Sequence, residues 1–414
     1  MSNRRKKIQK VNKKVLIATV DIGKKSHYGY WRSSSGADCR PFGFANTRAG
    51  FDTFWRTICT AQDQQDADSI IVGFESTGPY GEPLVHFLRT KTVKLVQINP
   101  MHTKRVKELS DNSPLKSDAK DPRVIADILQ LGHSLRVIVP TGQAAELRRL
   151  TTARERAVTD RTALLNRLQD RITIIFPEFL TVMNGVRSVS ARYLLKRYPF
   201  PEDIIRLGRS RLAKRLHALS KGQLGEKRAA ALIAAAKESI GITEGAASLR
   251  REVRYLLEQI AGVQRFISEL EAEMETYVGM IPYRNSLLSI KGIGTVTAAA
   301  IIGEAGDLSA FRSAKALIKL AGLNLYEVSS GVHKGTRRIT KRGRPLLRKL
   351  LFFAALNVVK KGALMHAYYQ KRIQQGMPPM KALVAVMRKL LRIMYALVRD
   401  NTTYTAEYSI LKAA

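Results

Sequence analysis

The sequence predicts an α/β N-terminal domain followed by a longer, mainly α-helical remainder. Between residues 14 and about 140, short runs rich in β-branched and apolar residues alternate with helical stretches. From residue 143 onward the helical period dominates. A length of 414 residues suits two to three domains. We therefore divide the chain into residues 1–142, 143–280 and 281–414.

The first part is predicted to form a layered α/β domain. The order of its strands and helices suits an RNase H-like fold, in which carboxylates converge at the ends of strands. Strands are expected near residues 15–21, 27–32, 69–75 and 93–98, and helices near residues 48–62, 80–90 and 120–132.

Four carboxylates in this part occupy positions that suit a metal site. Asp21 ends an apolar strand (VLIATVD) and Glu75 ends another (SIIVGFE), so neighbouring strands would bring both to one edge of a sheet. Asp118 and Asp121 lie three residues apart at the start of a helical segment, on one helix face. A carboxylate at the end of a buried strand is costly to desolvate unless a cation compensates it. The set predicts a Mg²⁺ site, since Mg²⁺ prefers oxygen ligands, and two such ions suit in-line phosphoryl transfer.

Each helical member of this set also has a structural explanation. Asp118 could cap the helix N-terminus, and Asp121 precedes Pro122, an arrangement typical of a helix start. The functional interpretation therefore depends on all four carboxylates together.

The charge of the chain predicts a nucleic-acid partner. It has 70 Lys and Arg against 34 Asp and Glu, a formal net charge of +36. Binding to nucleic acid uses such an excess of positive charge directly, because the cations neutralise phosphates. An enzyme that acts on small molecules gains nothing from it. The excess is also larger than solubility alone would require. Basic residues cluster at 4–7, 334–349 and 388–392. The first cluster could be a disordered tail, whereas the second is interleaved with apolar residues.

The remaining composition argues against export and against a membrane protein. Only Cys39 and Cys59 are present, too few for a disulfide framework or a zinc site. No run of 18 uncharged apolar residues occurs, and the N-terminus lacks the apolar core of a signal peptide. A cytoplasmic protein is therefore expected.

Two long helices are expected in the middle of the chain. Residues 143–176 have a continuous helical pattern, and the segment from Val253 to Tyr277 keeps a heptad seam for over three repeats. These helices could pair within one chain or between chains, and the seam alone leaves both open. The stretch 177–250 between them is predicted to be an inserted helical subdomain, to which the sequence assigns no function.

Two loops in the third part have the composition of phosphate-binding segments. The KGIG turn, Lys291–Gly294, resembles a helix-hairpin-helix, although any tight turn between helices needs glycine. Ser329-Ser330-Gly331 lies beside a basic stretch, where a serine is a plausible nucleophile and an ordinary turn is the alternative. The expected nucleic-acid contacts are Lys291, Gly292, Gly294, Lys334, Arg337, Arg338, Lys341, Arg342 and Arg344.

The chain resembles the DEDD-type transposases of insertion sequences, a family that includes the Piv and MooV DNA invertases. The resemblance rests on VDIGKKSH around Asp21, FESTGPY around Glu75, KSDAKDPRVIAD with Asp118 and Asp121, and the C-terminal IKGIG, FRSAKALIKLAGL, SSG and TKRG. The inserted subdomain is a departure from many members, and TKRG has threonine where serine is usual.

This resemblance implies a RuvC-like N-terminal domain, a coiled-coil connector and a C-terminal transposase domain with a serine nucleophile. It implies Asp21, Glu75, Asp118 and Asp121 as Mg²⁺ ligands and Ser330 as the nucleophile, with Ser329 as the fallback. The implied partners are donor DNA, target DNA and a structured bridge RNA, in a prokaryotic, nucleoid-associated protein. The serine and the carboxylates are over 200 residues apart in sequence, so a homo-oligomer, a dimer or tetramer, with a site shared between protomers is one expectation.

Two other functions remain open from the sequence. A Holliday-junction nuclease would use the same carboxylates with water as the nucleophile and would not need Ser330. A non-catalytic nucleic-acid-binding protein would need only the basic surface. A covalent adduct between protein and DNA distinguishes the recombinase from both.

Overall fold

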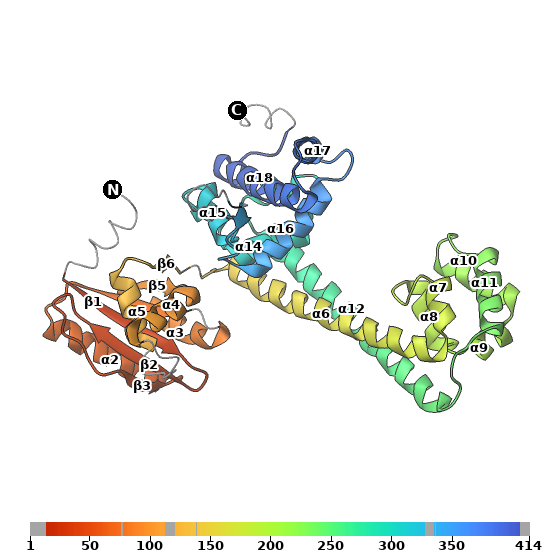
Figure 1. Cartoon of the computed structure of the whole chain (residues 1–414), viewed down its shortest axis with the longest axis horizontal. Coiled ribbons are helices and arrows are strands. Elements are labelled where there is room, and N and C mark those ends of the chain that lie inside the picture. Colours follow the sequence, from red (N-terminus) through yellow and green to blue (C-terminus); the bar gives the residue numbers. More distant parts are fainter. Residues whose placement is uncertain are drawn as a thin grey trace. The chain divides into compact units, whose positions relative to one another are not determined.

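The computed structural model describes residues 14–75, 78–111, 121–137, 139–327, 335 and 337–405. The chain forms two units that divide between residues 138 and 139 (Figure 1). This division lies close to the expected boundary after residue 142. The connector and the C-terminal helices, expected as two domains, belong to the second unit.

A six-stranded sheet forms the centre of the N-terminal unit, with the order β3-β2-β1-β4-β5-β6. The strands β1, β2 and β3 form an antiparallel meander, β4 and β5 run parallel to β1, and β6 is antiparallel to β5. The four predicted strands are confirmed, and β3 and β6 are additional short strands. The strands are β1 Val15–Ile22, β2 Ser26–Arg32, β3 Phe42–Ala45, β4 Ser69–Glu75, β5 Lys94–Ile98 and β6 Leu135–Arg136.

Helices cover both faces of this sheet, which explains why β1 and β4 are almost continuously apolar. Leu16, Ala18 and Val20 of β1 pack in a core with residues of α2 and α3, whereas Val15 and Ile17 pack in a second core with α5. The helices are α2 Arg48–Gln64, α3 Glu82–Arg89, α4 Pro100–Asp111 and α5 Asp121–Gln130. The three predicted helices are confirmed, and α4 was not expected.

The second unit is built on two long helices, α6 Gln143–Ile175 and α12 Ala246–Gly279, which pack against each other along their length (Figure 1). The heptad seam of α12 therefore pairs within the chain, one of the two alternatives left open by the sequence. Buried Ile260 and Ile267 belong to this seam. Polar pairs flank it: Arg161 Nη1 donates to Gln264 at 2.6 Å and Arg171 Nε donates to Glu252 at 2.8 Å.

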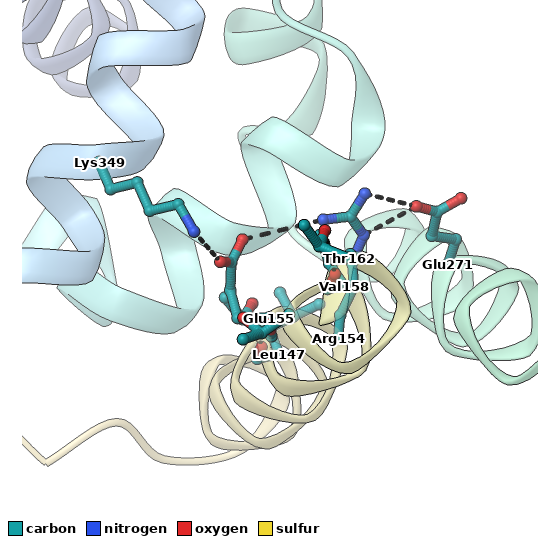
Figure 2. Close-up of polar contacts among 9 residues, drawn as sticks. Leu147, Arg154, Glu155, Val158, Thr162, Glu271 and Lys349 are labelled. Atoms are coloured by element: carbon teal, nitrogen blue, oxygen red, sulfur yellow. Dashed lines mark hydrogen bonds and ion pairs between the residues drawn. The ribbon is translucent and has the colours of Figure 1, made fainter. Parts of the chain in front are cut away.

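An ion-pair cluster joins α6 to both α12 and α16, the helix Pro345–Val358, as Figure 2 shows. Arg154 Nε and Nη2 lie 2.7 and 2.6 Å from Oε1 of Glu271 on α12. The neighbouring Glu155 accepts a hydrogen bond of 2.6 Å from Lys349 Nζ on α16. Arg154 Nη1 also lies 3.9 Å from Glu155 Oε1. The central hairpin and the C-terminal helices are therefore linked by charge as well as by apolar packing.

The expected helical insertion packs on the far half of the α6–α12 hairpin. Its core combines side chains of the insertion with Leu168 and Ile172 of α6 and Leu256 of α12. The chain after its last helix returns to the end of α6, because the amide of Ile242 donates to the carbonyl of Ile174 at 3.0 Å. The helices of the insertion are α7 Pro177–Val182, α8 Val189–Arg197, α9 Pro201–Leu207, α10 Arg209–Leu219 and α11 Glu226–Lys237.

The C-terminal helices surround a second core that includes the near half of the hairpin. The segment α14 is buried on nearly every side, and α16 and α18 pack against each other. These helices are α13 Arg284–Leu288, α14 Thr295–Ala305, α15 Ala314–Leu320, α16 Pro345–Val358, α17 His366–Gln374 and α18 Pro379–Asp400. In the described part of the chain, no helix combines the length and apolarity that a bilayer crossing requires.

Candidate active site

Asp21 and Glu75 lie at the carboxyl ends of two adjacent parallel strands. The register pairs Val20 of β1 with Phe74 of β4, so the next residues, Asp21 and Glu75, follow at the same edge of the sheet. Because side chains alternate along a strand, Asp21 shares a face with Thr19, two residues earlier. Glu75 likewise shares a face with Gly73, where an added Cβ would meet Leu129 of α5 at 2.4 Å. Both carboxylates therefore belong to the α5 side of the sheet, and both are half-buried.

The helix α5 brings a third carboxylate to this side of the sheet. Asp121 is its first residue and is only 7% exposed. The hydroxyl of Thr19 donates a hydrogen bond of 2.6 Å to the carbonyl of Pro122, and both groups are buried. This bond joins the start of α5 to β1 two residues before Asp21. Three of the four predicted ligands thus belong to one face of the sheet and the helix packed on it.

The other end of α5 is tied to β2. Arg32 Nη1 donates to Asp127 at 2.6 Å and to Gln130 at 2.9 Å. Burial raises the pKa of the neighbouring Tyr30 hydroxyl, and its hydrogen bond to Asp38 adds to the shift. Both ends of α5 are therefore held on the sheet, which fixes the orientation of the helix whose first residue is Asp121.

A divalent cation fits the chemistry of these donors, which are all carboxylate oxygens. Within the described residues, however, no three His, Cys, Asp or Glu side chains are gathered closely enough to hold a metal ion. The fourth predicted ligand, Asp118, lies outside the described residues. The metal site therefore stays a prediction.

His27, part of the VDIGKKSH motif, has a structural role that sequence reasoning missed. It is fully buried in β2, its ring contacts Phe44 and Phe51, and its Nδ1 accepts a hydrogen bond of 3.2 Å from the amide of Gly23. Burial lowers the pKa of His27, which keeps the ring neutral. His27 therefore supports the turn that follows Asp21. Thr19 was missed as well, because its partner is 103 residues away in sequence.

In sequence, the predicted nucleophilic serines fall between two short paired strands of the second unit. Strands β7, Leu325–Tyr326, and β8, Arg338–Ile339, pair antiparallel. Arg337 Nε donates to Glu327 at 2.9 Å across the hairpin. Ser329, Ser330 and Lys334 fall outside the described residues, so their roles stay predictions.

The basic stretch after the hairpin is held against the end of α15. The amide of Lys341 donates to the carbonyl of Gly322 at 3.0 Å, and an added Cβ on Gly343 would meet the carbonyl of Leu320 at 2.3 Å. The close approach requires glycine at residue 343. The exposed basic residues of this region are Arg337, Arg338, Lys341 and Arg342.

Arg344 differs from these neighbours, although the sequence expected it to contact nucleic acid. Its side chain is half-buried and donates to the backbone carbonyl of Glu304. Burial, with a contribution from nearby Arg148, lowers the pKa of Arg344 to about 10. Its hydrogen bond to Glu304 joins the basic stretch to α14.

The KGIG turn connects α13 to α14, as the sequence expected. Gly292 has φ +104, which requires glycine, and an added Cβ there would meet Val358 of α16 at 3.2 Å. Lys291 and Gly294 are exposed beside the N-terminus of α14. This arrangement is compatible with phosphate binding, and the helix-hairpin-helix itself stays a prediction.

Family models of known proteins match two separate parts of the chain. A family model described as a DEDD transposase of the IS110 type matches residues 18–177, and one described as a transposase of the IS116/IS110/IS902 family matches residues 284–370. The inserted helices lie between these two matches.

Two curated relatives match most of the chain, and a third matches a third of it. It is 24% identical to the insertion element IS110 43.6 kDa protein of Streptomyces coelicolor over 93% of this chain and 94% of that protein. It is 27% identical to the insertion element IS116 44.8 kDa protein of Streptomyces clavuligerus over 72% and 75% of the two chains. The pilin gene-inverting protein of Moraxella lacunata is 35% identical over 33% of this chain and 45% of its own. The chain therefore belongs to the IS110-type family of DEDD transposases, enzymes that cut and rejoin DNA.

Proposed function

We propose that this transposase cuts and rejoins DNA with a Mg²⁺-dependent carboxylate site and a serine nucleophile, under the direction of a structured guide RNA. The observation that carries the proposal is the placement of Asp21, Glu75 and Asp121 on the α5 side of the sheet. The strand order β3-β2-β1-β4-β5-β6, in which β2 is antiparallel to both β1 and β3 while β4 and β5 run parallel to β1, supports an RNase H-like and RuvC-like assignment of this unit.

The proposed metal ligands are Asp21, Glu75, Asp118 and Asp121. Membership of a DEDD family suggests a divalent cation, and donors that are all carboxylates favour Mg²⁺. A bound Mg²⁺ supplies positive charge that favours deprotonation of an attacking hydroxyl and neutralises the scissile phosphate. Asp21 and Glu75 would hold the ion from the sheet, and Asp121 would hold it from the helix.

Ser330 is the proposed nucleophile. Its hydroxyl oxygen forms a bond to the scissile phosphorus and loses its proton, while the 3′ oxygen leaves and gains a proton. One DNA strand is then joined to the protein as a phosphoserine, and the other has a free 3′ hydroxyl. Because the phosphoester is preserved, the strands can be rejoined without an external energy source. In sequence, Ser330 falls between β7 and β8, and the exposed Arg337 and Arg338 at β8 support the assignment.

The proposed nucleic-acid partners are donor DNA, target DNA and the guide RNA. The net charge of +36 and the exposed Arg337, Arg338, Lys341 and Arg342 support a polyanionic partner. We also propose a homo-oligomer. The apolar seam of α12 does not support it, because this seam packs against α6 of the same chain.

A covalent-adduct assay tests the serine step. The full-length protein with Mg²⁺ and a DNA carrying the element's ends should form an adduct that survives denaturation. Ser330→Ala should abolish both the adduct and cleavage, because the attacking oxygen is missing, and should retain nucleic-acid binding. Cleavage that persists in this variant would instead favour a nuclease that uses water.

Ser329→Ala is the matched control for this assay. The two serines are adjacent, and each variant removes one hydroxyl. We expect Ser329→Ala to be milder, because the family's serine directly precedes glycine, as Ser330 does. The reverse ranking would move the nucleophile by one residue.

A further inference from the structure

The C-terminal region contains a long segment that has no acidic residues. Between Glu327 and Asp400 the sequence has 17 Lys and Arg residues and no Asp or Glu. The segment includes α16, α17 and α18, so its positive charge is carried by packed helices. The basic residues at 388–392, noted in the sequence, lie on α18 and are not used by the proposed chemistry.

Two helices of this segment gather cations around one tyrosine. Tyr368 of α17 packs against the C-terminal core. Arg372 Cζ lies 5.1 Å from the centre of the Tyr368 ring, and Lys389 Nζ of α18 lies 4.4 Å from it. A cation held over an aromatic face gains electrostatic stabilisation. The packed tyrosine therefore fixes the position of charges from both helices.

Two further arginines of α18 increase the charge density. Arg388 and Arg392 are one turn apart, and Arg388 is half-buried while Arg392 is exposed. Burial, together with the charge of Arg392, lowers the pKa of Arg388. The buried Nε atoms of Arg372 and Arg388 have no hydrogen-bond partner among the described residues.

This arrangement is unfavourable in the free protein. A buried donor on a charged group without a partner carries a desolvation penalty, and like charges at close range repel each other. Residues 328–399 contain no acid, and the ion pairs found among the described residues of this segment are made by Arg337, Lys349 and Arg399, none of which belongs to the cluster. A polyanion bound at the surface would compensate the charge and accept hydrogen bonds from the guanidinium groups.

We propose that Tyr368, Arg372, Arg388, Lys389 and Arg392 form a further phosphate-binding site, which takes the backbone of DNA. DNA is the polyanion on which enzymes of this family act, and guanidinium groups match the geometry of phosphate oxygens. The second family match ends at residue 370, so most of this site lies beyond the part that the family model describes. The site adds to the exposed basic residues between 337 and 342.

A binding titration against salt tests this site. The double variant Arg388→Gln with Arg392→Gln removes two charges and keeps most of the side-chain length. With a short labelled duplex DNA of mixed sequence and the full-length protein, we expect weaker binding. The slope of log K against log salt should fall by about 0.9 for each phosphate that the variant no longer neutralises.

A charge-matched control separates the site from net charge. Arg254→Gln with Arg265→Gln removes two exposed charges from α12, where each arginine precedes a glutamate by four residues. This control should keep nearly the parental slope. Equal losses of DNA binding in the two double variants would overturn the proposal. So would a variant that binds single-stranded RNA more weakly but binds duplex DNA like the parent.

Thermal unfolding of the free protein supplies an independent check. Because the site concentrates uncompensated charge, Arg388→Gln with Arg392→Gln should unfold at the same temperature or higher, while it binds DNA more weakly. If the double variant misfolds, exposed Arg392→Gln alone is used, and parental binding by it would contradict the proposal. The titration requires no cleavage, so a failure of the serine chemistry leaves it unaffected.

Discussion

The hydroxyl of Thr19 in β1 donates a hydrogen bond of 2.6 Å to the carbonyl of Pro122 in α5. This contact spans 103 residues and joins the strand that ends in Asp21 to the helix that begins at Asp121. It therefore couples the positions of two proposed metal ligands, although neither Thr19 nor Pro122 is itself proposed as a ligand.

Thr19→Val should lower the stability of the protein and weaken its binding of Mg²⁺. Valine has a similar shape but leaves the buried carbonyl of Pro122 without its donor, at a cost of about 1–3 kcal/mol. We expect a lower unfolding temperature and a higher Mg²⁺ concentration for half-maximal strand cleavage. Thr19→Ser restores a hydroxyl and should recover the Mg²⁺ dependence. A Thr19→Val enzyme with the parental Mg²⁺ dependence would show that the contact is only structural.

Asp21→Asn should abolish strand cleavage and leave the fold intact. The change keeps the shape of the side chain at the end of β1 and removes the charge that a Mg²⁺ ligand needs. The control is Asp66→Asn, an exposed carboxylate that pairs with Lys14 at the other end of the sheet. Cleavage and circular dichroism are measured on both variants. Near-normal recombination by Asp21→Asn would remove the metal-site assignment.

The parts of the fold that could be predicted are those with a strong local signal. β1 and β4 are apolar on both faces, and α6 and α12 keep a helical period for over 30 residues. By contrast, β3 and β6 have only four and two residues. Each is a strand because it pairs with a neighbouring strand, β2 or β5, and such a pairing has no local signal in the sequence.

Contacts between distant segments explain most of what could not be predicted. The heptad seam identifies buried positions of α12 but does not specify whether the partner is α6 of the same chain. Arg344 has the same sequence character as its basic neighbours, and its bond to the carbonyl of Glu304, 40 residues away, could not be predicted. The sequence could predict that Asp21 and Glu75 lie near each other, because parallel strands place their carboxyl ends at one edge of the sheet. The position of Asp121 relative to them depends on contacts of α5 with distant residues, among them the bond between Thr19 and Pro122.

Ile260→Ala should destabilise the second unit and leave the mass of the protein in solution unchanged. Ile260 is 2% exposed in the seam that packs against α6, so the cavity should cost about 2–5 kcal/mol. Tyr255→Ala on the exposed face of the same helix is the control and should be nearly neutral. Denaturant unfolding and light scattering measure the two properties. A smaller mass with unchanged unfolding would show that the seam also joins protomers.

His27 should make the stability of the N-terminal unit depend on pH. Burial lowers the pKa of His27 in the folded state below the ordinary value of 6.5. Between these two values the unfolded chain binds more protons than the folded one, so acid favours unfolding. The contribution of His27 is therefore complete above pH 6.5 and declines as the pH falls below it, toward the pKa of the folded state.

His27→Asn isolates this contribution, because asparagine does not titrate and its side-chain oxygen can accept the hydrogen bond from Gly23 that Nδ1 accepts now. The unfolding midpoint of the parent, measured in denaturant, should fall more steeply below pH 6.5 than that of the variant. Above this pH, the difference between the two midpoints should be constant. Parallel pH profiles on both sides of pH 6.5 would mean that the histidine does not remain neutral in the folded protein, and the role assigned to its burial would then be wrong.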